Sequence, residues 1–168
     1  MKQESWKTRI FRYGINLYPM FFGTGGKVLF ISGDWHQVRV RLKLNIWTRN
    51  YVGTIFGGSM FAATDPMYMV MLINILGKDY VAWDKSACIQ FKKPGKGKLI
   101  AEFEYTEAEI ADIKRITQEN GKYEFKKATN WIDRSGETVS VVDRTLYVAT
   151  KEYYKARNER RKQQAAQS

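Results

Sequence analysis

Hydrophobic and polar residues alternate most regularly between Val38 and Thr48. Because successive side chains of a strand point to opposite faces, this alternation predicts a strand with one buried face. The pattern before it is interrupted by Pro19 and by the glycine-rich stretch Gly23–Gly26, which break regular elements. We therefore expect residues 1–33 to form a helical or irregular lead-in. The apolar face of the predicted strand consists of Val38, Val40, Leu42, Leu44 and Ile46.

A second pattern covers residues 58–76, where most positions are apolar and Gly77 follows as a helix-ending residue. A helix that is apolar nearly all round must be covered by other structure. The segment is also about long enough to span a bilayer, but Asp65 and Pro66 occupy its middle, where a charge is costly. We therefore interpret it as a buried helix, and expect a cytoplasmic protein rather than an integral membrane protein.

The rest of the chain predicts further strands and helices. The strands cover residues 81–91, 98–106, 123–132 and 138–150, and the helices cover 107–120 and the polar tail 151–168. Pro94-Gly95-Lys96-Gly97 predicts a hairpin between the first two of these strands. The order of elements predicts an α+β domain over residues 34–150, in which one curved antiparallel sheet wraps around the buried helix.

Composition limits the kinds of protein this can be. A chain of 168 residues fits one domain, and 44% hydrophobic residues argue against disorder. The single cysteine excludes an intrachain disulfide framework, and one histidine with one cysteine leads us to expect no metal site. The 28 lysines and arginines exceed the acidic residues enough to give a net charge of +11. Such a charge predicts an anionic partner: nucleic acid, a lipid surface or a phosphorylated ligand.

Two segments carry much of this excess charge. Residues 92–98 contain four lysines and no acid, which indicates either a site for phosphate groups or a solubilising turn. The tail after Thr150 has six lysines and arginines against two glutamates, a net charge of +4. We interpret the tail as a solvated helix end, because the chain has no helix-turn-helix or other recognisable nucleic-acid motif.

The most informative stretch runs from Asn50 to Asp65. Gly57 and Gly58 open the predicted buried helix. Glycine allows a ligand to approach the backbone, and the first N–H groups of a helix are unpaired donors that can polarise a carbonyl oxygen. Asp65 follows about two helical turns later, roughly 10 Å along the axis, so it cannot act on the same atom unless a second subunit presents it. In the alternative interpretation, the glycines permit tight packing and Asp65 bonds to backbone groups freed by Pro66.

The runs NYVGTIFGGSMFAATDP (residues 50–66) and VAWDKSACIQFKKPGKG (residues 81–97) resemble the hotdog-fold acyl-CoA thioesterase superfamily. The resemblance is nearest to the phenylacetyl-CoA thioesterase branch and a related bacterial subfamily, and covers roughly residues 15–150. It implies a curved antiparallel sheet around one long helix, and a homodimer or a dimer of dimers.

The resemblance also implies roles for particular residues. Gly58, with Gly57, would bind the thioester carbonyl through backbone amides, and Asp65 would be the base or nucleophile acting across a subunit interface. Asn50 would orient the substrate or a water molecule. The remaining substrate-binding residues would be Phe56, Ser59, Lys93, Lys96 and Lys98. No cofactor is implied, because coenzyme A arrives as part of the substrate.

One departure from the family pattern affects the choice between functions. Many relatives carry a histidine just before the glycine pair, where this chain has Ile55 and Phe56. The only histidine, His36, lies far from the motif, and we expect it to be structural or on the surface. We therefore expect an acyl-CoA or related acyl thioester hydrolase. A non-catalytic acyl-CoA-binding or regulatory protein is the second candidate, and nucleic-acid binding through the tail is the third.

Overall fold

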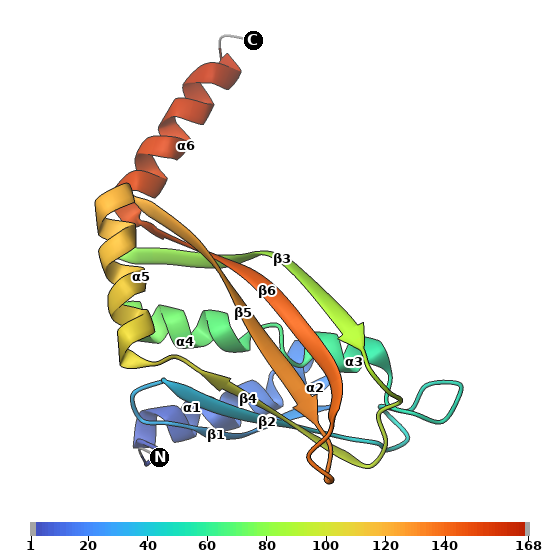
Figure 1. Cartoon of the computed structure of the whole chain (residues 1–168). Coiled ribbons are helices and arrows are strands. Elements are labelled where there is room, and N and C mark those ends of the chain that lie inside the picture. Colours follow the sequence, from blue (N-terminus) through green and yellow to red (C-terminus); the bar gives the residue numbers. More distant parts are fainter. Residues whose placement is uncertain (1–2, 167–168) are drawn as a thin grey trace.

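The computed structural model describes residues 3–166 of the chain. In this part of the chain, strands form one antiparallel sheet in the order β1-β2-β4-β5-β6-β3, which curves around the central helices (Figure 1). The helices are α1 (Trp6–Leu17), α2 (Pro19–Phe22), α3 (Gly57–Ala62), α4 (Met67–Leu76), α5 (Glu107–Asn120) and α6 (Lys151–Ala166). The strands are β1 (Gly26–Ile31), β2 (Gln37–Lys43), β3 (Tyr80–Phe91), β4 (Lys98–Glu104), β5 (Lys122–Ile132) and β6 (Thr138–Thr150). The expected α+β architecture is confirmed.

The buried helix predicted over residues 58–76 is divided into α3 and α4 by a turn that contains Pro66. Proline has no backbone N–H and cannot donate to the preceding turn. The residues before Pro66 instead form a tighter turn, in which the Asp65 N–H donates to the Ala62 carbonyl, three residues earlier, at 3.1 Å. The side chains that α4 buries in the core are Met67, Tyr68, Met71, Leu72 and Leu76.

Hydrogen bonds from buried side chains attach these helices to the sheet. The indole N–H of Trp131 in β5 donates to the Met60 carbonyl in α3 at 2.8 Å, and the Tyr68 hydroxyl in α4 donates to the Ala128 carbonyl at 3.0 Å. Trp131 and Tyr68 are both buried, so their polar atoms need such partners. These two bonds attach α3 and α4 to β5.

The hairpin expected between residues 81–91 and 98–106 is wrong. β3 pairs with β6, whereas β4 lies between β2 and β5. The turn residues between them serve as a crossing connection: the Lys92 N–H donates to the Val139 carbonyl, and the Gly95 carbonyl accepts from Ile55. The turn residues therefore predict where β3 ends and β4 begins, but not which strands are neighbours.

The predicted lead-in contains a strand of the sheet. Gly26–Ile31 pairs with β2, and α1 packs against it. The predicted strand 38–48 ends earlier, at Lys43, because the Asn45 side chain accepts hydrogen bonds from the N–H groups of Trp47 and Thr48 at 2.8 and 3.1 Å. An asparagine that bonds to the backbone two residues ahead forms a turn and stops a strand.

The second half of the chain follows the sequence pattern closely. The helix predicted over residues 107–120 is α5, which begins with a capping box between Thr106 and Glu109. The predicted second hairpin is β5–β6. Beyond it, α6 projects away from the body of the domain as a polar helix (Figure 1).

Candidate functional site

Asp65 lies in the turn between α3 and α4, and its carboxylate contacts a buried arginine that the sequence analysis did not single out. Arg144 of β6 donates from Nη1 to Asp65 Oδ1 at 3.1 Å and from Nη2 to Thr64 Oγ1 at 3.1 Å. The Arg144 side chain is 2% exposed, whereas that of Asp65 is 65% exposed. The arginine therefore holds the carboxylate from the buried side and leaves it accessible to solvent.

A second carboxylate shares the same guanidinium group. Asp84 of β3 accepts from Arg144 Nη1, and its side chain is mostly buried. Burial raises the pKa of Asp84, although the positive charge of Arg144 opposes this shift. Asp84 Oδ1 and Arg144 Nε are both buried with no hydrogen-bond partner in the described part of the chain. Arg144 is thus the only link that the structure shows between Asp65 and this buried acid.

The sequence contained a signal for Arg144. In β6 the buried residues of one face follow each other at every second position: Val142, Arg144, Leu146 and Val148. A single charged residue on an otherwise apolar inward face needs a buried partner of opposite charge. Asp84 and its neighbour Lys85 point to opposite faces, and the structure shows that Lys85 is the outward one, paired with Glu124 at 2.9 Å.

Asp65 also lies in the wall of an open apolar cavity of about 780 Å³. The N-terminal helices form one wall, and α3 and the start of α4 form the other. Among the described residues that line the cavity, Asp65 is the only charged one. The other main lining residues are Phe11, Ile15, Phe21, Phe61, Pro66 and Val70.

Gly57 and Gly58 are the first two residues of α3. A Cβ atom on Gly57 would lie 2.6 Å from the Phe91 ring, and one on Gly58 would lie 2.3 Å from the Phe56 ring. Close packing of two aromatic rings therefore explains the glycines without any ligand. Their N–H groups make no hydrogen bond within the described residues, because the first bonds of the helix are donated by Ser59 and Met60 to the Phe56 carbonyl. These N–H groups can therefore act as donors to a ligand.

A second cavity, of about 440 Å³, brings together Gly57, Asn50 and Lys93. The Asn50 side chain closes its own loop, since Nδ2 donates to Thr54 Oγ1 at 2.9 Å and Oδ1 accepts from the Thr54 N–H at 3.0 Å. Lys93 is paired with Asp133 at 2.6 Å and with Glu137, and these hydrogen bonds raise the pKa of Lys93. Its charge is therefore compensated within the protein.

The other predicted binding residues do not line this second cavity. Phe56 is the residue before α3, and its ring lies against Gly58; Ser59 is buried in the first turn of the helix. Lys96 is exposed in the connection between β3 and β4, and Lys98 begins β4 opposite Lys43. Lys98 and Lys43 are neighbours of like charge, which favours an anion beside them.

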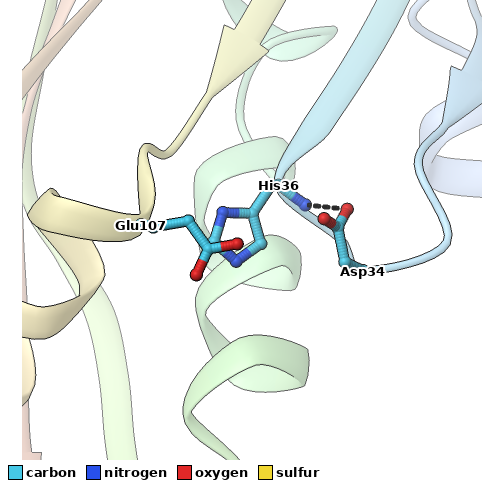
Figure 2. Close-up of side chains that lie close together, drawn as sticks. All are labelled: Asp34, His36 and Glu107. Atoms are coloured by element: carbon cyan, nitrogen blue, oxygen red, sulfur yellow. Dashed lines mark hydrogen bonds between the residues drawn. The ribbon is translucent and has the colours of Figure 1, made fainter. Parts of the chain in front are cut away.

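A separate cluster forms where the turn after β1 meets the start of α5. One ligand atom from each of Asp34, His36 and Glu107 lies within 4.8 Å of the others, and Figure 2 shows the Glu107 carboxylate beside the His36 ring. His36 Nδ1 lies 2.7 Å from the Tyr105 carbonyl, which leaves Nε2 for other partners. Histidine held in this way by a carbonyl is common at metal sites, so the cluster could hold a divalent cation. It shares no residue with the cavity that contains Asp65.

An antiparallel sheet curved around a central helix is the hotdog architecture, and solved structures confirm it. A Pseudomonas aeruginosa protein of unknown function, described as a probable thioesterase, has a TM-score of 0.76 at 18% identity, covering 89% of this chain and 99% of that one. A thioesterase from Haemophilus influenzae has a TM-score of 0.62 at 10% identity, covering 89% and 94%. A hypothetical thioesterase from Streptococcus pneumoniae, solved with coenzyme A, has a TM-score of 0.53 at 18% identity, covering 74% and 86%.

The sequence comparison assigns the family. The chain belongs to the family described as a domain of unknown function (DUF4442), whose model matches residues 7–148. No curated protein sequence matches this chain. The protein is thus a hotdog protein similar to thioesterases in fold.

Proposed function

We propose that the protein hydrolyses an acyl-CoA or a related acyl thioester at an interface between two copies of the chain. The observation that carries this proposal is the exposed Asp65 carboxylate, held by the buried Arg144 at the wall of an apolar cavity. The fold shared with thioesterases supports the same reaction. A thioester is already activated, so a carboxylate base and an oxyanion donor are sufficient for its hydrolysis.

In this proposal Asp65 removes a proton from a water molecule, and the resulting hydroxide attacks the thioester carbonyl carbon. The negative charge that develops on the carbonyl oxygen is stabilised by the free N–H groups of Gly57 and Gly58. The carbon–sulfur bond then breaks, and the thiolate of coenzyme A takes up the proton from Asp65. The products are a carboxylic acid and free thiol, and no cofactor takes part.

The proposal needs two chains because, within one chain, Asp65 and Gly57 line different cavities. β3 supports such pairing: in the described structure it pairs only with β6, so its other edge is free to add a strand. Its last residue, Phe91, packs on Gly57, so a partner at this edge would lie beside the glycines. We propose a homodimer formed in this way, or a dimer of such dimers.

Coenzyme A would lie beside the second cavity, with its phosphates on the lysine-rich connection between β3 and β4. Lys96 and Lys98 are the best candidates, because Lys93 is already paired with two acids. Because acyl-CoA thioesters occur in the cytoplasm, we propose that the enzyme is cytoplasmic.

A non-catalytic acyl-CoA-binding protein is the alternative. It is favoured by the absence of a histidine before the glycine pair and by the ion pair that occupies one Asp65 oxygen. The two functions differ in a single result: acyl-CoA would raise the melting temperature in both, but free thiol would appear only with the hydrolase.

The test is release of free thiol from a panel of acyl-CoAs by the wild-type protein and by Asp65→Asn. We expect the substitution to lower kcat by about 100-fold or more, because it removes the general base. Asp79→Asn, which changes an exposed aspartate after α4, is the matched control and should leave kcat unchanged. Equal turnover by wild type and Asp65→Asn would refute the proposed role.

A further inference from the structure

The cavity between the N-terminal helices and α3–α4 is unusual in how much apolar surface it leaves in contact with water. Ile10, Tyr18 and Met20 form part of its wall and are 63%, 59% and 74% exposed. Open apolar surfaces of this kind mark ligand grooves or contact surfaces. The volume of about 780 Å³ lies within the range of about 300–1,000 Å³ that is usual for small-molecule sites.

Gly14 leaves space in the groove beside α1. It lies in the interior of α1, where glycine is less favourable than alanine, and its backbone does not have a positive φ that would require glycine. A Cβ atom at Gly14 would have no heavy atom within 4 Å, so packing does not exclude a side chain either. Gly14 lines the groove, and its missing side chain keeps that wall open.

The chemistry of the lining selects an uncharged alkyl chain. Asp65 is the only charged residue among residues 3–166 that lines the groove, and a second carboxylate at the far end of an acyl group would meet no cation from this part of the chain. Thr24 offers little to a polar ligand, because its hydroxyl already donates to the Phe21 carbonyl at 2.7 Å. The remaining walls are apolar, so the binding free energy of a ligand here would come from buried hydrocarbon.

We propose that this groove binds the alkyl chain of a medium- or long-chain fatty acyl thioester, with Gly14 keeping room for it beside α1. The inference rests on the proposed function, because Asp65 joins the groove to the reacting carbonyl. It narrows the substrate class: longer acyl chains without a terminal charge are preferred over acetyl groups and over acyl groups that end in a carboxylate.

The test uses alkyl-CoA thioethers, which cannot be hydrolysed, so that binding is measured separately from turnover. We expect calorimetry to show that dodecyl-CoA binds the wild-type protein at least tenfold more tightly than ethyl-CoA. Gly14→Phe should remove this difference by filling the groove, while the affinity for ethyl-CoA stays unchanged. Gly14→Ala is the matched control: it should not lower the melting temperature and should keep a preference for dodecyl-CoA.

Val70→Phe, on the opposite wall, is the second variant to use if Gly14→Phe does not fold. Equal affinity of the wild type for both thioethers, or undiminished dodecyl-CoA binding by Gly14→Phe and Val70→Phe, would overturn the inference. A change of oligomeric state caused by Gly14→Phe with no change in thioether binding would also overturn it, because a second copy of the chain would then cover the groove. Chain-length-dependent binding without any hydrolysis would support the groove and contradict the hydrolase.

Discussion

At the scale of single residues, the site is organised by Arg144. One guanidinium group, 2% exposed, contacts the exposed Asp65 and the largely buried Asp84. Because a buried charge is tolerated only with a partner, the arginine and Asp84 depend on each other for stability. Asp65 gains a fixed orientation from the same contact. Arg144 therefore contributes both to the stability of the fold and to the proposed chemistry.

Arg144→Met should lower the free energy of unfolding by about 3 kcal/mol at neutral pH, because it leaves Asp84 buried without its charge partner. Urea denaturation measures this value. Arg39→Met is the control, since Arg39 pairs with Glu102 at 2.6 Å on the exposed surface of the sheet, and its loss should cost no more than about 1 kcal/mol. Similar losses for the two variants would contradict the role given to Arg144.

The residues of the candidate site differ in how far the sequence could predict them. Asp65 and the glycine pair were found from their spacing, and the free N–H groups of Gly57 and Gly58 agree with the predicted donors. The ion pairs of Lys93 with Asp133 and Glu137 could not be predicted from the sequence, because these acids lie in the hairpin between β5 and β6, far along the chain. Contacts between distant segments depend on strand order, and local pattern carries little information about it.

At the scale of elements, the same limit explains the errors in the fold. The bounds of β6 and α5 agree with the prediction because alternation, capping and turn residues act locally. The predicted pairing of β3 with β4 is wrong because Pro94 and Gly95 end a strand equally well in a hairpin and in a crossing connection. β1 was missed because Gly26 and Lys27 weaken its alternating pattern.

The contact between α5 and β5 should make the free energy of unfolding decrease at acidic pH. Burial raises the pKa of Glu109, but hydrogen bonds from Lys127 and from the Thr106 N–H outweigh this and hold it below the ordinary 4.5. Because the unfolded chain then binds more protons, this stabilisation is present above about pH 4.5 and is lost as the pH falls further. Glu109→Gln should therefore show a smaller loss of unfolding free energy between pH 5 and about pH 3 than wild type. Glu119→Gln, at the other end of α5, is the control; an unchanged pH dependence in Glu109→Gln would count against this contact.

The free edge of β3 gives a prediction about assembly. Lys85 is the extra residue of a bulge, since the pairing with β6 passes from Asp84 to Ser86. Proline is tolerated in sheets at bulges and edges, but it would disturb a strand added to this edge. Lys85→Pro should weaken self-association at least tenfold in light scattering or sedimentation, while Lys85→Ala should not. Equal association of both variants would show that β3 is not the interface.

At the scale of the whole molecule, the net charge of +11 divides into parts with different surroundings. The tail helix α6 projects away from the sheet, with Tyr153 against Gly121 and Tyr154 against Trp83 near its start. Its later basic residues are exposed and touch neither of the two cavities. Two lysines of the connection between β3 and β4, Lys92 and Lys93, line the same cavity as Gly57 instead. Charge distribution therefore favours a phosphate-bearing ligand at that connection over nucleic acid bound along the domain.

The central claim is that Asp65 of one copy acts with the glycine pair of another, and mixing two inactive variants tests it directly. Asp65→Asn removes the acid, and Gly58→Val blocks the donors while the Phe56 ring, 57% exposed, has room to move aside. If the acid and the glycines act across a two-fold interface, half of the dimers in an equal mixture are mixed and each of these has one intact site. Thiol release from dodecanoyl-CoA should then recover to about a quarter of the wild-type rate. A mixture that stays as inactive as its two components, although the chains are shown to exchange, would contradict the claim.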